Sequence, residues 1–151
     1  MERVVGVDIH PGMFAVVKEI AEEQQLHQVQ FVQADLLADT FSAIGRFDTV
    51  TALHVIEHFT EADMYRVLAN LLKVTSRRLI LMVPYEQEPE TIYEHKQLFT
   101  RAKLDAMGQW CIQQLDGAAR MWSEDCEGGL LLIERCHSQE GNSETISSVS
   151  Q

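Results

Sequence analysis

The sequence has few basic residues and no long hydrophobic run. It contains 12 Lys and Arg against 23 Asp and Glu, a formal net charge of −11, and its longest basic run is the pair Arg77 and Arg78. Nucleic-acid phosphates are bound by a basic surface, so we expect no nucleic-acid partner, although one compact basic pocket stays compatible with the composition. No apolar stretch approaches the roughly 18 residues of a membrane span, and residues 1–6 resemble neither a signal nor a transit peptide. We therefore expect a cytoplasmic protein without membrane contact.

Cysteine is also scarce, and its pattern excludes a disulfide framework. The three cysteines, Cys111, Cys126 and Cys136, are odd in number and lack metal-type spacing, which favours free thiols in a reducing compartment. A chain of 151 residues with 46% hydrophobic content can form one domain without disulfides or metals. We place that domain at residues 1–137 and expect the polar tail, residues 138–151, to be disordered.

Short apolar segments alternate with helical patterns over most of the chain. Helices are predicted at residues 11–25, 60–72 and 100–107. Thr60 is expected to cap the helix at 60–72, and Gly108 is expected to end the helix at 100–107. The predicted strands are residues 4–8, 29–35, 46–53, 78–83, 110–115 and 129–135. This order predicts an α/β fold with a mostly parallel sheet and a carboxy-terminal antiparallel hairpin.

Acidic residues close the first two predicted strands, where ligands of parallel sheets bind. Asp8 can accept hydrogen bonds from two vicinal ribose hydroxyls, and Ile9 can lie flat against an adenine ring. Asp35 can accept from an exocyclic amine while the backbone N–H of Leu36 donates to a ring nitrogen. The alternatives are local: Asp8 caps the following helix, and Asp35 is a turn residue.

Five segments together resemble one enzyme family. They are VVGVDIHP at 4–11, VQFVQADL at 29–36, FDTVTALHVIEH at 47–58, LILMVP at 79–84 and EHKQLFT at 94–100. In order and spacing they resemble class I S-adenosylmethionine-dependent methyltransferases, in particular the small-molecule methylases that include quinone-pathway enzymes. The resemblance implies a Rossmann-like sheet, S-adenosylmethionine as cofactor and a small-molecule methyl acceptor.

The same resemblance implies roles for particular residues. Asp8 matches the ribose-binding acid, with Ile9 beside it, and Asp35 with Leu36 matches the adenine-contacting pair. His54 falls where the fourth strand of the family meets the methyl-transfer site, so we assign it as the base or the acceptor-orienting residue. His58 is the second candidate for that role.

The chain departs from the family in lacking its first strand and the Gly-x-Gly-x-Gly turn expected ahead of Asp8. We therefore expect an amino-terminally truncated domain with impaired cofactor binding, or alternatively a non-catalytic remnant that acts as an interaction protein. We expect the strand at 4–8 to move over and pair with the strand at 46–53. The alternatives are a sheet that stays split, or a homo-oligomer that pairs through exposed strand edges.

His54, Glu57 and His58 also form an H-x-x-E-H pattern. Zinc peptidases place this pattern inside a helix, whereas here it follows a strand. A divalent metal held by Glu57, His58 and His95, as in some methyltransferases of small RNA ends, is a further alternative, although the position of His54 is normally acidic there. We predict no metal: Glu57 and His58 are expected to begin the next helix and line the substrate mouth.

An acidic loop follows the strand at 78–83. Its charges are expected to be mostly solvated, although such a loop can act as a lid over a substrate. The acids are Glu86, Glu88, Glu90 and Glu94.

Overall fold

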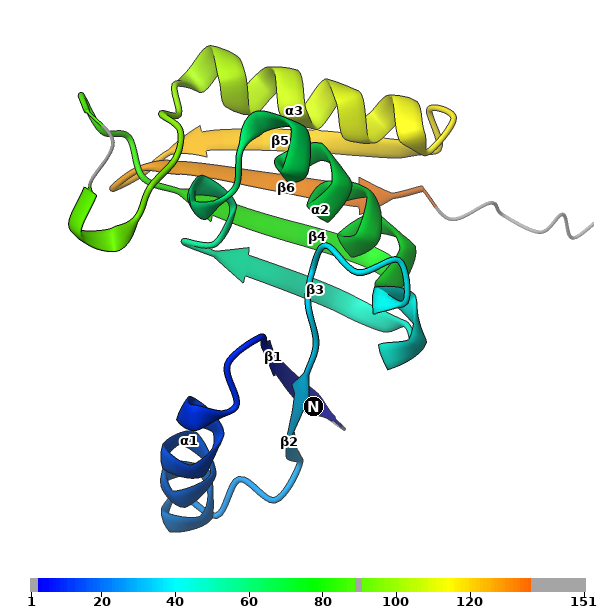
Figure 1. The fold of residues 1–151 in the computed structure, drawn as a ribbon. Helices are drawn as coiled ribbons and strands as arrows, with labels where there is room; N and C mark the ends of the chain where they lie inside the picture. The colour runs from blue at the N-terminus through cyan, green and yellow to red at the C-terminus, as the bar shows by residue number, and fades with distance from the viewer. Residues whose placement is uncertain (1–2, 89–90, 137–151) are drawn as a thin grey trace, which may run out of the picture.

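The computed structural model describes residues 3–88 and 91–136, so the predicted disorder of residues 138–151 lies outside the described part. Strands alternate with helices through most of it, and the last two strands follow one another directly (Figure 1). The order is β1 (Val4–Asp8), α1 (Gly12–Glu23), β2 (Val29–Gln33), η1 (Phe41–Ile44), β3 (Phe47–Leu53), η2 (Ile56–His58), α2 (Glu61–Val74), β4 (Thr75–Val83), η3 (Thr91–Tyr93), α3 (Arg101–Gln114), β5 (Ala119–Asp125) and β6 (Gly129–Arg135), where η marks short 3-10 helices.

The strands form two sheets rather than one. β1 pairs in parallel with β2, and a second sheet has the order β3-β4-β6-β5, in which β3 and β4 are parallel and β5 and β6 form the antiparallel hairpin. The α/β class and the carboxy-terminal hairpin are therefore confirmed, and β4 lies inside its sheet. No helix in the described part is long and apolar enough to cross a membrane.

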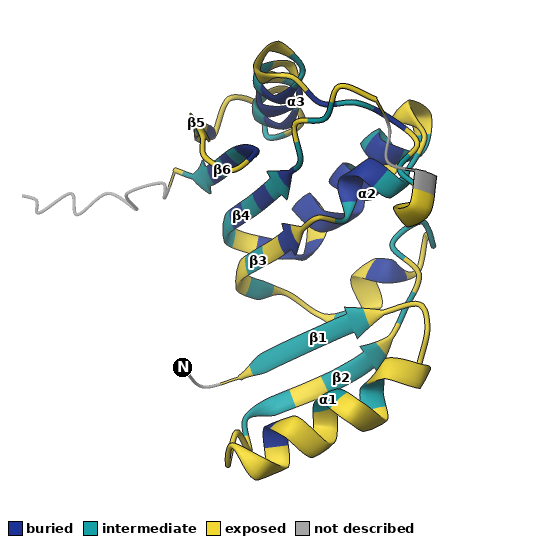
Figure 2. Cartoon of the chain, turned by 90° about the vertical axis from the view of Figure 1, so that its left-hand side faces the viewer, coloured by how far each residue is buried: buried dark blue, intermediate teal, exposed yellow. Residues whose placement is uncertain are grey.

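The expected pairing of β1 with β3 is wrong. Within the described residues β1 has only β2 as a partner, and β1 and β3 stay apart (Figure 2). β1 is held through five residue pairs to β2, and the bridge to β3 is made by a side chain: the guanidinium of Arg3 lies 5.6 Å from the centre of the Phe47 ring. The sheet therefore stays split, which was one of the alternatives.

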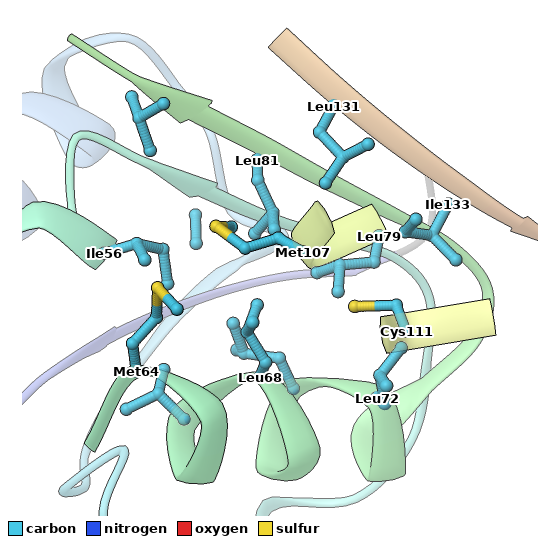
Figure 3. Packing of buried hydrophobic residues seen from close by; sticks show 14 of the residues in the cluster. Ile56, Met64, Leu68, Leu72, Leu79, Leu81, Met107, Cys111, Leu131 and Ile133 are labelled. Carbon is cyan, nitrogen blue, oxygen red and sulfur yellow. The ribbon is translucent and has the colours of Figure 1, made fainter. Parts of the chain in front are cut away.

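The hydrophobic core lies between the larger sheet and the helices α2 and α3 (Figure 3). Apolar residues of α2 recur at helical spacing and face β4, and the side chain of Thr60 accepts a hydrogen bond from the backbone of Asp63, as predicted for the cap. The fully buried members include Ile56, Met64, Leu68, Leu79, Leu81, Met107, Cys111 and Leu131. Burial raises the pKa of the Cys111 thiol to about 12, so this cysteine is a packing residue.

The strand predicted at residues 110–115 is wrong, as is the stop at Gly108. α3 runs through both, because Leu104, Met107 and Cys111 form one buried stripe at helical spacing. Gly108 is buried where the helix approaches the hairpin: an added Cβ would lie 2.6 Å from the Cε of Met121. The glycine thus permits close packing instead of ending the helix.

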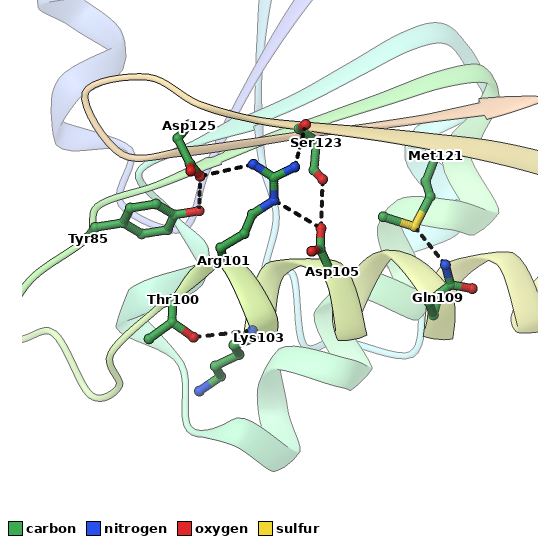
Figure 4. Close-up of polar contacts among 9 residues, drawn as sticks. All are labelled: Tyr85, Thr100, Arg101, Lys103, Asp105, Gln109, Met121, Ser123 and Asp125. Carbon is green, nitrogen blue, oxygen red and sulfur yellow. Dashed lines mark hydrogen bonds and ion pairs between the residues drawn. The ribbon is translucent and has the colours of Figure 1, made fainter.

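Polar contacts fasten α3 to the hairpin (Figure 4). Arg101 donates to the backbone oxygen of Ser123 at 2.9 Å and pairs with Asp125 at 3.2 Å, and Ser123 donates to Asp105 at 2.6 Å. The hydroxyl of Tyr85 donates to Asp125 at 2.9 Å. The loop after β4 is therefore tied to the same hairpin.

Candidate functional site

The four parallel strands point the same way, so the ends of β1, β2 and β3 lie along one edge (Figure 2). Asp8 ends β1, Asp35 follows β2 by two residues, and His54 follows β3 directly. The N–H of Ala34 donates to the backbone oxygen of Asp8 at 3.1 Å, which joins the first two ends. This edge is where ligands of open parallel sheets bind.

Asp8 and Asp35 each close a local turn with one carboxylate oxygen. Oδ1 of Asp8 accepts from the N–H of His10 at 2.7 Å, and Oδ1 of Asp35 accepts from the N–H of Leu37 at 2.8 Å. Asp8 is not the cap of α1: the N-cap residue is Pro11, which makes no side-chain capping hydrogen bond. Both carboxylates are exposed, so the turn geometry is compatible with ligand contact.

Ile9 and Leu36 differ in how firmly they are held. Ile9 is 50% exposed beside the Asp8 turn. Leu36 packs against the core, and its backbone oxygen accepts from the side chain of buried Asn70 at 2.8 Å. The backbone after Asp35 is thereby fixed to α2, whereas the Ile9 side chain is available for contact with a ligand.

His54 lies at a sharp change of direction after β3. Its φ is 54°, in the left-handed region, while its N–H still donates to the backbone oxygen of Met82 in β4 at 2.9 Å. This geometry turns the half-exposed imidazole out of the strand, with Nδ1 3.4 Å from Oε1 of Glu57. A non-glycine residue in this region is uncommon and often marks a functional position.

Glu57 is fully buried, and neither of its carboxylate oxygens has a hydrogen-bond partner. The sequence analysis expected Glu57 and His58 to begin α2, and this expectation is wrong. Both residues lie in the separate turn η2, which ends before Thr60, the cap of α2. A buried carboxylate without a hydrogen bond is costly, and the nearest polar group is the imidazole of His54. Its environment therefore suits a cation or a protonated imidazole.

The loop before α3 brings His95 to this carboxylate. The N–H of Lys96 donates to the backbone oxygen of Glu57 at 2.8 Å, and Nε2 of Gln97 donates to the backbone oxygen of Phe59 at 2.9 Å. The rings of His58 and His95 meet edge to face, with centroids 4.9 Å apart. These backbone contacts explain a proximity that sequence spacing does not give.

Glu86 is a site residue that the sequence interpretation missed. It was grouped with solvated loop charges, but both of its oxygens lie 2.9 Å from Nδ1 of His95. A carboxylate on one imidazole nitrogen orients the ring and leaves Nε2 for another contact. The available signal was the position of Glu86 in the same loop as His95.

Glu57, His58 and His95 form a group that fits a metal ion. Each offers a ligand atom, and these atoms lie within 4.8 Å of one another. One carboxylate and two imidazoles suit a transition metal or zinc, and Glu86 behind His95 is the usual outer partner of a metal-bound histidine. Donor atoms on a metal at about 2.1 Å lie roughly 3–3.5 Å apart, so the side chains would move closer on binding.

A basic pocket, which the composition left possible, lies at the opposite end of the strands of the larger sheet. Its cavity of about 610 Å³ is lined by Arg77, Arg120 and Arg135, together with Asp48 and Glu134. The acids neutralise part of the charge, since Arg120 lies 2.7 Å from Glu134 and Arg77 lies 3.7 Å from Asp48. Hydrogen bonds from Arg120 and Arg78 lower the pKa of Glu134. None of its lining residues belongs to the edge at which Asp8, Asp35 and His54 follow the strands.

The parallel strands with polar residues at their carboxyl ends define a Rossmann-like methyltransferase fold. A family model described as a methyltransferase domain matches residues 1–78, more than half of the chain, and the chain belongs to this family. S-adenosylmethionine is the cofactor of this fold, and solved neighbours contain it or S-adenosylhomocysteine. No curated protein sequence matches the chain.

Three solved structures illustrate the similarity. A small RNA methyltransferase, HEN1, has a TM-score of 0.73 at 17% identity, covering 88% of this chain and 20% of that one. Magnesium protoporphyrin IX methyltransferase (ChlM) from Synechocystis PCC 6803, with bound SAM, has a TM-score of 0.62 at 20% identity, covering 88% and 59%. YcgJ from Bacillus subtilis has a TM-score of 0.60 at 18% identity, covering 82% and 55%. At these identities the likeness concerns the fold, and the chain spans only part of each structure.

Proposed function

We propose that this domain takes part in methyl transfer from S-adenosylmethionine to a small-molecule acceptor. The observation that carries the proposal is the common edge at which Asp8, Asp35 and His54 follow three parallel strands. ChlM, a neighbour that is named for a small-molecule substrate, magnesium protoporphyrin IX, supports this acceptor class. When bound, S-adenosylmethionine supplies a methyl group on an already activated sulfonium, so the protein mainly positions the reactants.

On this proposal Asp8 accepts hydrogen bonds from the ribose hydroxyls and Asp35 accepts from the adenine amine. Their turns support these roles, because each turn uses Oδ1 and holds the carboxylate at the sheet edge. Leu36 donates its N–H to an adenine ring nitrogen, and exposed Ile9 covers the ring face. The contact of Leu36 with Asn70 supports a rigid backbone at that point.

His54 is proposed as the base or the acceptor-orienting residue, with His58 second. The buried carboxylate of Glu57, 3.4 Å from Nδ1 of His54, supports this role. A carboxylate on Nδ1 favours the tautomer in which Nε2 is free to accept a proton from an acceptor hydroxyl. Glu57 would then act through His54 as a positioning residue.

The direct test is calorimetric titration with S-adenosylhomocysteine, which needs no knowledge of the acceptor. Because β1 and β3 are not joined, the site lacks a continuous sheet beneath it, and we expect weak binding, with Kd ~10⁻⁴ M. With an identified acceptor, His54→Ala should lower turnover by about 10²–10⁴-fold and leave cofactor affinity nearly unchanged. No detectable binding would favour the alternative of a non-catalytic methyltransferase-fold protein.

A second candidate is metal-assisted transfer to a hydroxyl acceptor. It is favoured by the group of Glu57, His58 and His95, which would hold a divalent ion, with Glu86 orienting His95. A metal ion lowers the pKa of a bound hydroxyl and makes it a better nucleophile. Because one structural neighbour is a small RNA methyltransferase, an RNA hydroxyl is one acceptor to test. The net negative charge of this chain disfavours an RNA acceptor.

Titration of the metal-free chain with Co²⁺, followed by its visible absorption, tests this candidate. Binding should be lost in Glu57→Gln and retained in Glu88→Gln, which changes an exposed acid of the loop that carries Glu86. Equal binding by both variants would place the ion elsewhere. Absence of binding would remove the metal while leaving the small-molecule proposal intact.

A further inference from the structure

β5 forms an outer edge of the larger sheet. In the order β3-β4-β6-β5 it pairs with β6, and no strand lies beyond it in the described part of the chain (Figure 2). Its seven residues pair with β6 without a register shift, and none of them is a proline. Prolines, bulges and very short lengths are common protections of an edge strand against pairing with another chain. β5 has none of these three and presents a regular edge.

Alternate residues of β5 direct their backbone groups away from β6. The backbone oxygen of Ala118 accepts from the N–H of Cys136 at 2.9 Å. At the other end of the strand, the N–H of Cys126 donates to the backbone oxygen of Gly128, also at 2.9 Å. Because successive residues bond to opposite sides of a strand, the even-numbered positions bond toward β6. The outward groups therefore belong to Ala119, Met121, Ser123 and Asp125.

One of these outward groups already has a partner. The side chain of Arg101 in α3 donates to the backbone oxygen of Ser123 at 2.9 Å. A carbonyl oxygen has two lone pairs and can accept a second hydrogen bond. The contact with Arg101 therefore leaves Ser123 able to pair with a further strand.

The side chains of β5 that face away from α3 carry a self-complementary charge pattern. Met121 lies against Gly108 and Ser123 bonds Asp105, so the odd-numbered side chains face α3. Side chains alternate between the two faces of a strand. The opposite face therefore presents an exposed basic, aromatic and acidic residue in succession, namely Arg120, Trp122 and Glu124.

This pattern selects one arrangement of two such strands. In an antiparallel pair centred on Trp122, Arg120 of each copy lies opposite Glu124 of the other, and the two Trp122 side chains lie opposite each other. Opposite charges and aromatic pairs in directly opposed positions stabilise antiparallel strands. A parallel pair in register would oppose like charges, which is destabilising. The antiparallel pair also brings all seven residues of both strands into the ladder.

We propose that two copies of this chain associate edge to edge through β5, as a two-fold symmetric antiparallel pair centred on Trp122. The symmetry repeats each contact, so the interface contains the Arg120–Glu124 pair twice. The half-exposed Trp122 side chains supply the apolar centre of this interface. The ladder joins two four-stranded sheets into one. This inference is independent of methyl transfer.

Sedimentation equilibrium of the full chain tests the association, at about 0.15 M salt to screen long-range repulsion between the acidic copies. We expect a reversible monomer–dimer equilibrium. Arg120→Glu and Glu124→Arg each oppose like charges at both symmetric contacts, so each should raise the dimer Kd about tenfold or more. The matched control is Glu127→Arg, which makes the same charge change at an exposed residue just after β5 and should leave Kd unchanged. A chain that stays monomeric at about 1 mM overturns the proposal.

Mixing the two charge variants separates this pairing from other modes of association. In a heterodimer of Arg120→Glu with Glu124→Arg, both contacts again join opposite charges. The mixture should therefore associate about as tightly as the unmodified chain, although each variant alone associates weakly. Failure of two folded variants to associate contradicts the pairing centred on Trp122.

Hydrogen exchange of the unmodified chain locates the interface, and it decides the question if Arg120→Glu, which also loses its contact with Glu134, fails to fold. The amides of Met121 and Ser123 should exchange about tenfold or more slowly in the dimer than in the dilute monomer. The amides of Arg120 and Trp122, which already bond toward β6, should change less. Protection confined to β1, β2 or β3 would place the interface at another edge and overturn the proposal.

Discussion

The unit β1-α1-β2 and the unit built on the larger sheet have different interiors. In the first, Ala21 is the one buried hydrophobic residue, and Met13, Val16 and Ile20 on α1 are each about half exposed. In the second, two helices and four strands enclose nearly the whole core. The same alternation of strand and helix therefore gives a well-packed unit in one place and an open one in the other. An amphipathic pattern stabilises a segment only when another layer covers it.

The largest effect is expected from truncating the core of the packed unit. Leu81→Ala in β4 removes a fully buried side chain and should lower the free energy of unfolding by about 2–5 kcal/mol. Ile20→Ala in α1, whose side chain is 51% exposed, should change it by less than about 0.5 kcal/mol. Urea unfolding measures both. Similar losses in the two variants would show that the units are equally packed.

Cofactor binding should depend on the open unit through Asp8. Asp8→Ala should weaken S-adenosylhomocysteine binding by about 1.5–3 kcal/mol, the range for a hydrogen bond to a charged group, with folding retained. The control is Glu19→Ala on exposed α1, which should leave the affinity unchanged in the same calorimetric titration. If Asp8→Ala unfolds most of the chain while the fraction that remains folded binds with unaltered affinity, then the role of Asp8 is purely structural.

Two glycines in helices sharpen the comparison. Gly108 in α3 is pressed against the hairpin, so in Gly108→Ala the end of the Met121 side chain and Leu131 must shift. The overpacking cost should exceed the gain in helix propensity and leave a net destabilisation of about 1 kcal/mol. Gly12 at the start of α1 has open space around it. Gly12→Ala should be neutral or stabilising by up to about 1 kcal/mol, because alanine restricts the unfolded chain. Thermal unfolding distinguishes the two, and destabilisation by both changes would contradict the openness of α1.

The smallest effect concerns alkaline pH. Burial, together with the hydrogen bond to Asp125, raises the pKa of Tyr85 from 10.0 to about 12. The folded state therefore holds this proton more tightly, and its contribution to stability, complete below pH 10, is lost as the pH rises toward 12. Tyr85→Phe should show a shallower decline in unfolding free energy over that range. Tyr93→Phe, at a 65% exposed residue, should decline like the unmodified chain.

Much of the fold is readable from local sequence. The strands β1 to β4 and β6 and the Thr60 cap follow from apolar runs, turn residues and capping chemistry, each acting over a few neighbours. A closing hairpin was predicted, but its first strand is β5, which the sequence analysis did not identify. Residues 110–115 were misassigned because a short segment with the apolar residues Trp110, Cys111, Ile112 and Leu115 fits a strand or a buried helix equally well. Only the contact of Gly108 with Met121 and Leu131 shows that this glycine serves packing.

The candidate site divides in the same way. The sequence by itself determined that Asp8, Asp35 and His54 follow strands, because a strand end is a local property. Tertiary structure alone decided that Glu57, His58, His95 and Glu86 meet, because hydrogen bonds from Lys96 and Gln97 to the backbone around η2 join segments nearly forty residues apart. It also decided that β1 and β3 remain separate, since every strand carries the same backbone donors and acceptors, and these do not specify which neighbouring strand is the partner.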